Sequence, residues 1–95
     1  MGIFGIKKVS CPKNQWTTII SNFGTGMPAY WNITFKSIGG EKVDGTYIEK
    51  RYWWIFPQQP VTGKITEQMN FQRYWINAIY SLKVCPATDV IAEID

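Results

Sequence analysis

Residues 74–84 alternate between two kinds of side chain. The even positions are all apolar or aromatic: Tyr74, Ile76, Ala78, Tyr80, Leu82 and Val84. The odd positions mix Trp75 and Ile79 with three polar residues. A β-strand projects successive side chains to opposite faces, so this period of two predicts a strand with one buried face and one mostly solvated face.

Further β-type runs rich in β-branched and aromatic residues recur along the chain, and no segment has a helical period with a convincing cap. The predicted strands cover 9–11, 15–21, 30–38, 46–56, 61–71, 74–84 and 90–94. Asp44-Gly45 offers the chemistry of a hairpin turn between two of them. This pattern predicts an all-β protein, an antiparallel β-sandwich of about six to eight strands, with a small β-barrel as the alternative.

The length and composition fit one domain over residues 1–95, with a short apolar N-terminal arm at 1–8. Apolar residues make up 45% of the chain, enough for a hydrophobic interior. The net charge of +3 is well below the basic density that drives nucleic-acid binding.

The sequence shows neither a signal peptide nor a membrane span. The start is apolar and then basic, which reverses the order of charges in a secretory signal. The longest uncharged stretch, 14–35, is too polar to cross a bilayer. We therefore expect a soluble protein made in the cytoplasm, with export by another route left open.

Two cysteines, Cys11 and Cys85, each precede a proline. They would form either a disulfide between the first and last strands, worth about 4 kcal/mol by loop entropy, or two buried free thiols. Two thiols without histidine do not supply a metal site, and no motif for a cofactor is present. We expect neither metal nor cofactor.

The chain contains no histidine, which rules out nucleophile–histidine pairs and favours a protein that is not an enzyme. Its carboxylates mostly fall in predicted turns or on solvated strand faces: Glu41, Asp44, Glu49, Glu67 and Asp89. Only Glu67 interrupts an apolar face, as Lys50 does on its own strand. A cross-strand Lys50–Glu67 pair would account for both.

The sequence Arg-Tyr-Trp occurs twice, at 51–53 and 73–75. The alternation places four aromatic residues in the core, namely Tyr52, Trp54, Tyr74 and Tyr80. Trp53 and Trp75 have the opposite parity, so at least one should be exposed, and together they would form a partner-binding patch. In the alternative interpretation every ring is part of the core.

Two further segments are candidate partner-binding surfaces. The N-terminal arm contributes Ile3, Phe4 and Ile6. The glycine-rich loop 22–28 contributes Phe23 and Met27, an adaptable apolar tip suited to docking. Alternatively, Phe23 and Met27 fold back and cap the sandwich.

These features favour a structural protein that assembles with copies of itself or docks on a larger complex of virion or filament type. The alternative is a carbohydrate-binding module, in which Trp53, Trp75 and Trp31 stack on sugars and Asn77, Gln58 or Gln72 bonds hydroxyls. A third hypothesis, single-stranded nucleic-acid binding through Lys50, Arg51 and Arg73, is disfavoured by the small net charge.

Overall fold

The computed structural model describes residues 7–23 and 28–95, and within these ranges the chain is all-β with no helix. The strands are β1 (Lys7–Cys11), β2 (Thr17–Phe23), β3 (Ala29–Ser37), β4 (Gly45–Trp53), β5 (Phe56–Pro57), β6 (Val61–Lys64), β7 (Gln68–Arg73), β8 (Ile79–Pro86) and β9 (Val90–Ile94). The predicted all-β class and antiparallel sandwich are confirmed.

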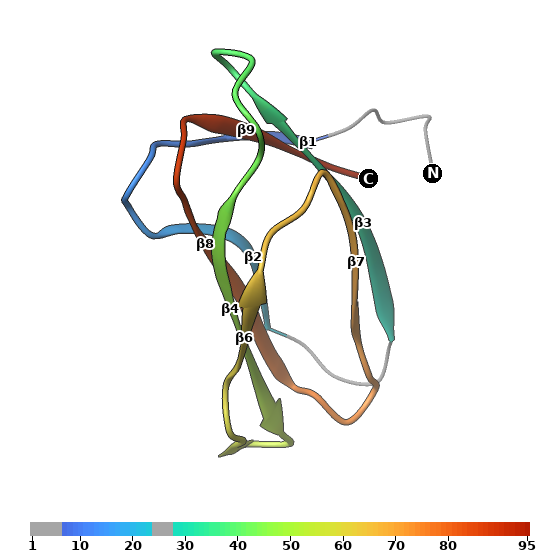
Figure 1. Ribbon diagram of the computed structural model, residues 1–95. Helices are drawn as coiled ribbons and strands as arrows, with labels where there is room; N and C mark the ends of the chain where they lie inside the picture. The colour runs from blue at the N-terminus through green and yellow to red at the C-terminus, as the bar shows by residue number, and fades with distance from the viewer. Residues whose placement is uncertain (1–6, 24–27) are drawn as a thin grey trace.

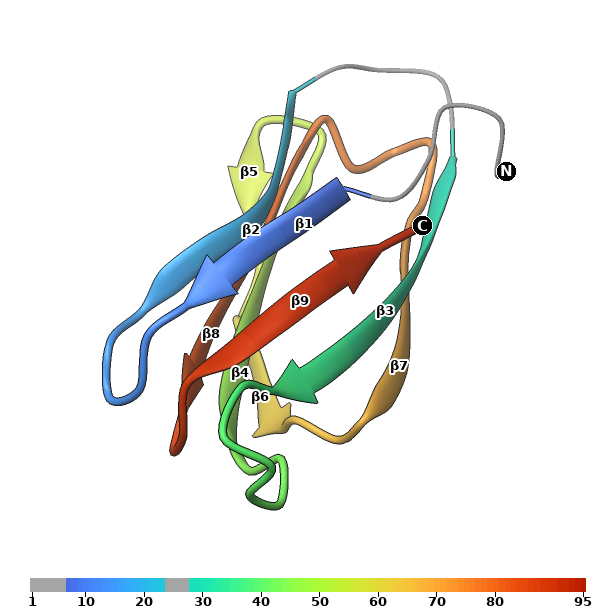
Figure 2. The same ribbon diagram turned by 90° about the horizontal axis from the view of Figure 1, so that it is seen from above.

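The strands form two layers. The first sheet has the order β1-β9-β3-β7, and the second has the order β2-β8-β4-β5, with β6 also paired to β4. Figure 1 shows the two sheets facing each other, and Figure 2 shows β1, β9, β3 and β7 side by side in front of the second sheet. Every pairing is antiparallel.

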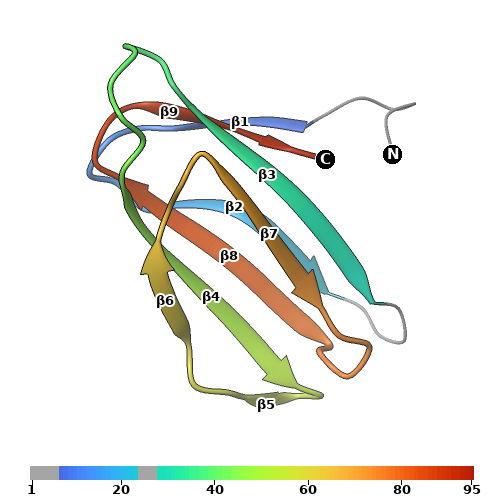
Figure 3. The ribbon, with the colours of Figure 1, turned by 45° about the vertical axis from the view of Figure 1, so that its right-hand side comes forward.

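The two halves of the chain pair with each other throughout. Moving inward from the ends, β1 pairs with β9, β2 with β8, β3 with β7 and β4 with β6. The chain is thus one long hairpin whose two arms are wound together into two sheets, with its bend around the two-residue strand β5 (Figure 3). Without β5, this is the connectivity of an eight-stranded jelly roll.

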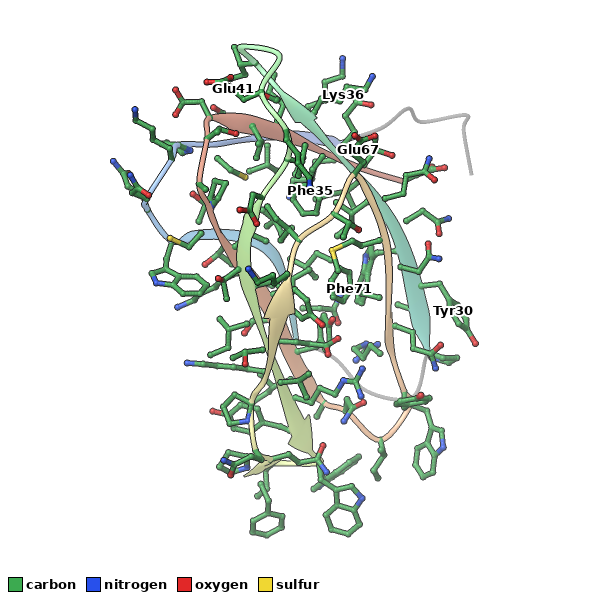
Figure 4. The ribbon with its side chains drawn as sticks, viewed as in Figure 1. Tyr30, Phe35, Lys36, Glu41, Glu67 and Phe71 are labelled. Atoms are coloured by element: carbon green, nitrogen blue, oxygen red, sulfur yellow. The ribbon has the colours of Figure 1, made fainter. Side chains whose placement is uncertain are left out.

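The core lies between the sheets and is built by the inward-facing residues of alternating strands. In β8 the inward positions Tyr80, Leu82 and Val84 are fully buried, as the alternation predicts. Phe35 of β3 and Phe71 of β7 point into the same layer from the first sheet (Figure 4). The tryptophans are mostly elsewhere, so aliphatic side chains and a few rings fill this interior.

Three predicted strands differ from the observed ones by more than two residues at an end. The range 61–71 divides into β6 and β7, because the chain crosses between sheets there and buries Ile65. The range 74–84 begins only at Ile79, since the preceding residues form a turn. The range 46–56 ends at Trp53 and turns back at Trp54, where φ is 59°.

Two further predictions near the ends of strands are wrong. Asp44-Gly45 is not a hairpin turn, because β3 and β4 belong to different sheets. The N-terminal arm does not extend to residue 8, because Lys7 and Lys8 are part of β1 and pair with Ile94 and Glu93.

Cys11 and Cys85 are free thiols, so the disulfide alternative is not realised. Cys11 is buried between the sheets, where burial raises the pKa of its thiol. In β8 the neighbours of Cys85, Val84 and Pro86, are buried. The alternation of the strand therefore turns Cys85 toward the outer face, away from Cys11.

Gly45 gives a direct test of how closely β4 approaches β8. Its φ is 137°, and an added Cβ would lie 2.6 Å from the backbone Cα of Pro86. We expect Gly45→Ala to lower the free energy of unfolding by about 2–4 kcal/mol, because backbone strain and backbone overlap add together.

Gly40→Ala is the matched control, since Gly40 also has a positive φ but open space around it. This variant should lose only about 1 kcal/mol. Urea unfolding of both variants measures the difference. Equal losses would contradict the close approach.

Candidate functional site

One end of the sandwich carries a concentration of exposed apolar side chains. It includes the turn after β4 and the β7–β8 connection, which lie at the same end of the molecule (Figure 3). We call this surface the aromatic end; its residues are Trp53, Trp54, Ile55, Phe56, Tyr74 and Trp75, all exposed. Figure 4 shows Lys36 and Glu41 toward the opposite end, so the two ends differ in chemistry.

Asn77 ties the two loops of the aromatic end together. Its side chain is almost fully buried; Nδ2 donates to Tyr52 O at 2.9 Å, and Oδ1 accepts from Tyr74 N at 3.0 Å. The backbone adds a bond from Trp54 N to Ile76 O at 2.8 Å. The bonds from Asn77 Nδ2 to Tyr52 O and from Trp54 N to Ile76 O cross between the loops, so the exposed rings lie on a preorganised base.

The two Arg-Tyr-Trp copies meet at this end. Arg51 Nη2 donates to Gln72 O at 3.4 Å, and the Arg51 guanidinium carbon lies 5.5 Å from the centre of the Tyr74 ring. Arg73 is buried and donates from Nη1 to Asn77 O at 2.9 Å. Both arginines therefore brace the loops from within, while the tryptophans of the repeats point outward.

The two predicted partner residues at this end are exposed, whereas two of the aromatic residues predicted to lie in the core are exposed as well. Trp53 and Trp75 are 54% and 61% exposed, which confirms the expectation that at least one would be. Tyr80 is in the core as predicted. Trp54 and Tyr74 were expected there too, but both are exposed because they lie in turns, where strand parity no longer applies.

The other predicted partner residues fall outside what the structure describes. Ile3, Phe4, Ile6 and Met27 lie outside the described residues, and for Phe23 the description covers its place in β2 but not its side chain. These candidates stay predictions.

A second feature is a cleft of about 470 Å³ on the side of the sandwich. The first sheet contributes Trp31 and Phe71 to its walls, and the second sheet contributes Tyr47. Tyr47 packs edge-on against Phe71, with ring centres 5.2 Å apart. Trp31 stacks on Tyr80 beneath it at 5.1 Å. The cleft therefore has aromatic walls fixed by ring packing.

The cleft also contains a buried charged network that the sequence did not predict. Glu49, 5% exposed, accepts at Oε2 from the Tyr80 hydroxyl and from Arg51 Nη2, the latter at 3.2 Å. Burial is the main cause that raises the pKa of Tyr80 far above its ordinary value. The hydrogen bond from its hydroxyl to Glu49 and the negative charge of Glu49 raise this pKa further. The network holds one carboxylate in a fixed position beside a cation.

Glu49 is one of the carboxylates of which most are predicted to lie in turns or on solvated strand faces, but in the structure it is buried. The available signal was its parity, since Glu49 alternates with Tyr47 and Arg51, and this is the inward face. The predicted Lys50–Glu67 pair is wrong. Lys50 pairs with Ser81 of β8, and Glu67 lies in the connection before β7, in the other sheet.

Comparisons with known proteins return no match among protein-family models, curated proteins or solved structures. Over residues 7–23 and 28–95, no helix has the length and apolar character needed to cross a bilayer. The same ranges contain no group of three or more Cys, Asp or Glu side chains placed to hold a metal ion.

The raised pKa of Tyr80 predicts how stability depends on pH. Unfolded Tyr80 loses its proton near the ordinary pKa of 10.0, whereas the folded protein retains it to higher pH. Above about pH 10 the unfolded state therefore binds fewer protons, and stability falls as pH rises. Tyr80→Phe should make this decline shallower by up to about 1.4 kcal/mol per pH unit.

Urea unfolding between about pH 8 and pH 11 measures these slopes. Tyr80→Phe should also lose about 1–3 kcal/mol at neutral pH, since Glu49 loses a hydrogen bond in a buried site. Tyr30→Phe, which removes a well-exposed hydroxyl, is the control and should keep the slope of the unmodified protein. An unchanged slope in Tyr80→Phe would contradict the assignment.

Proposed function

We propose that this chain is a non-enzymatic assembly subunit that associates with a second copy of itself through the aromatic end. The observation that carries the proposal is the aromatic end itself. Its six large side chains are exposed, and the two loops that carry them are joined by the hydrogen bond from Asn77 to Tyr52. Contiguous exposed apolar surface on a small protein typically marks an interaction site. Tryptophan on a preorganised surface is the residue type most enriched where binding energy concentrates.

The charge distribution favours a second copy as the partner. The whole chain carries a net charge of +3, so two copies repel each other at long range. The segment 52–61, however, contains no charged residue. An isologous contact centred on this segment would place apolar rings against apolar rings, without opposing like charges.

Two other observations agree with an assembly role. Jelly-roll sheets serve as capsid subunits in viruses, which supports a virion-type assembly at the level of fold analogy alone. The absence of histidine from the sequence, together with the engagement of buried Glu49 by Tyr80 and Arg51, favours a protein that is not an enzyme.

Carbohydrate binding at Trp53 and Trp75 has less support. That hypothesis assigned sugar hydroxyls to Asn77, but both polar atoms of this amide already bond the backbone of the loops. Without Asn77, the hypothesis retains Gln58 and Gln72 as its candidate partners for sugar hydroxyls.

Sedimentation measurements of the double variant Trp53→Ser/Phe56→Ser test self-association. We expect the unmodified chain to form dimers or larger species at micromolar concentration. The double variant should weaken association by at least about tenfold, because it removes two central apolar contacts.

Trp16→Ser is the matched control. Trp16 is exposed to a similar extent, 53%, but belongs to the β1–β2 connection. It should leave association unchanged. An unmodified chain that stays monomeric up to about 100 μM, or a Trp16→Ser effect as large as that of the double variant, would refute the proposal.

A further inference from the structure

The cleft between the sheets has the size and composition of a small-molecule site. Its volume of about 470 Å³ is within the range of ligand pockets, roughly 300–1,000 Å³. Aromatic side chains line part of the cleft, and polar and charged groups line the rest, namely Asn32, Glu49, Arg51, Asn70 and Gln72. Aromatic faces beside several hydrogen-bonding groups suit a ligand that itself has both apolar and polar surface.

The charged groups keep unused hydrogen-bonding capacity. Both hydrogen bonds that Glu49 accepts go to Oε2, so Oε1 accepts none from a described residue. Toward the described residues, Arg51 donates only from Nη2. Its Nη1 therefore has no acceptor among those residues. The cleft therefore presents an acceptor and a donor close together.

The pairing of these charges restricts the ligand. An anionic group near Arg51 would also lie near the Glu49 carboxylate, and a cation near Glu49 would lie near the guanidinium. A neutral hydroxyl meets neither penalty, because it donates to a carboxylate and accepts from a guanidinium. Neighbouring hydroxyls on one ring would satisfy both groups together.

We propose that this cleft binds a neutral carbohydrate. A sugar hydroxyl donates to Glu49 Oε1, and an adjacent ring oxygen or hydroxyl accepts from Arg51. The C–H face of the pyranose ring packs on the aromatic walls formed by Trp31, Tyr47 and Phe71, as apolar sugar faces do on aromatic rings. Tyr80, which bonds Glu49 from below, is a positioning residue.

Nitrogen–proton correlation NMR with a panel of neutral methyl glycosides tests the proposal. The five tryptophans give separate indole reporters. A binding sugar should shift the Trp31 indole and leave those of Trp53 and Trp75 in place. Glu49→Gln should weaken that binding by about tenfold or more, since a charge-assisted hydrogen bond is lost.

Lys50→Gln is the matched control, because Lys50 is adjacent to Glu49 in β4 and faces outward. It should leave affinity unchanged. If Glu49→Gln does not fold, Tyr30→Ala, at the exposed rim of the cleft, should weaken binding a few-fold in a folded protein.

Several outcomes would overturn the proposal. These are the absence of a Trp31 shift with every neutral glycoside, stronger binding of a uronic acid or sugar phosphate than of its neutral counterpart, and equal losses in Glu49→Gln and Lys50→Gln. None of them bears on self-association, which depends on Trp53 and Phe56 at the end of the molecule. The two proposals can therefore fail separately.

Discussion

The antiparallel pairing of the two halves of the chain is the constraint on which the rest of this structure depends. Because Lys7 pairs with Ile94 and Thr46 pairs with Lys64, the pairing runs from the chain ends to the bend. Among the described residues, no third layer covers the bend, and its large apolar side chains are exposed. This chain places Trp53, Trp54, Ile55 and Phe56 there, and the winding thus produces the aromatic end.

Strand β4 links the two surfaces. Its inward positions Tyr47, Glu49 and Arg51 belong to the cleft, and it ends at Trp53 in the aromatic end. Arg51 contacts both, since it bonds Glu49 on one side and lies over Tyr74 on the other. One guanidinium therefore helps fix both the carboxylate of the cleft and the β7–β8 connection.

The alternation of apolar and polar residues predicts the features that depend on strand geometry alone. It identified the sandwich and the buried face of Tyr80, Leu82 and Val84, and it gave the expectation that at least one of Trp53 and Trp75 is exposed. The alternation did not predict the features that depend on contacts between residues far apart in the sequence. The alternation of 74–84 continues through Asn77, but this residue lies outside the strand. Its amide donates to Tyr52 O, 25 positions earlier in the chain, and this bond holds the segment in the turn. Glu49 is buried because it accepts hydrogen bonds from Tyr80 and Arg51. Its parity with Tyr47 places it on one face of β4, but aromatic residues on both faces did not show which face is buried.

The Glu49 network is difficult to explain as a stabilising device. Removing a carboxylate and a guanidinium from water opposes folding, and apolar side chains of similar volume often stabilise such a site as well or better. The described contacts satisfy only one oxygen of Glu49, although its side chain is almost fully buried. A carboxylate kept only for stability would be expected to use both oxygens within the protein. Glu49 lines the cleft, and its Oε1 is not among the buried atoms that lack a partner, so this oxygen is open to the cleft and can accept a hydrogen bond from a molecule that enters there.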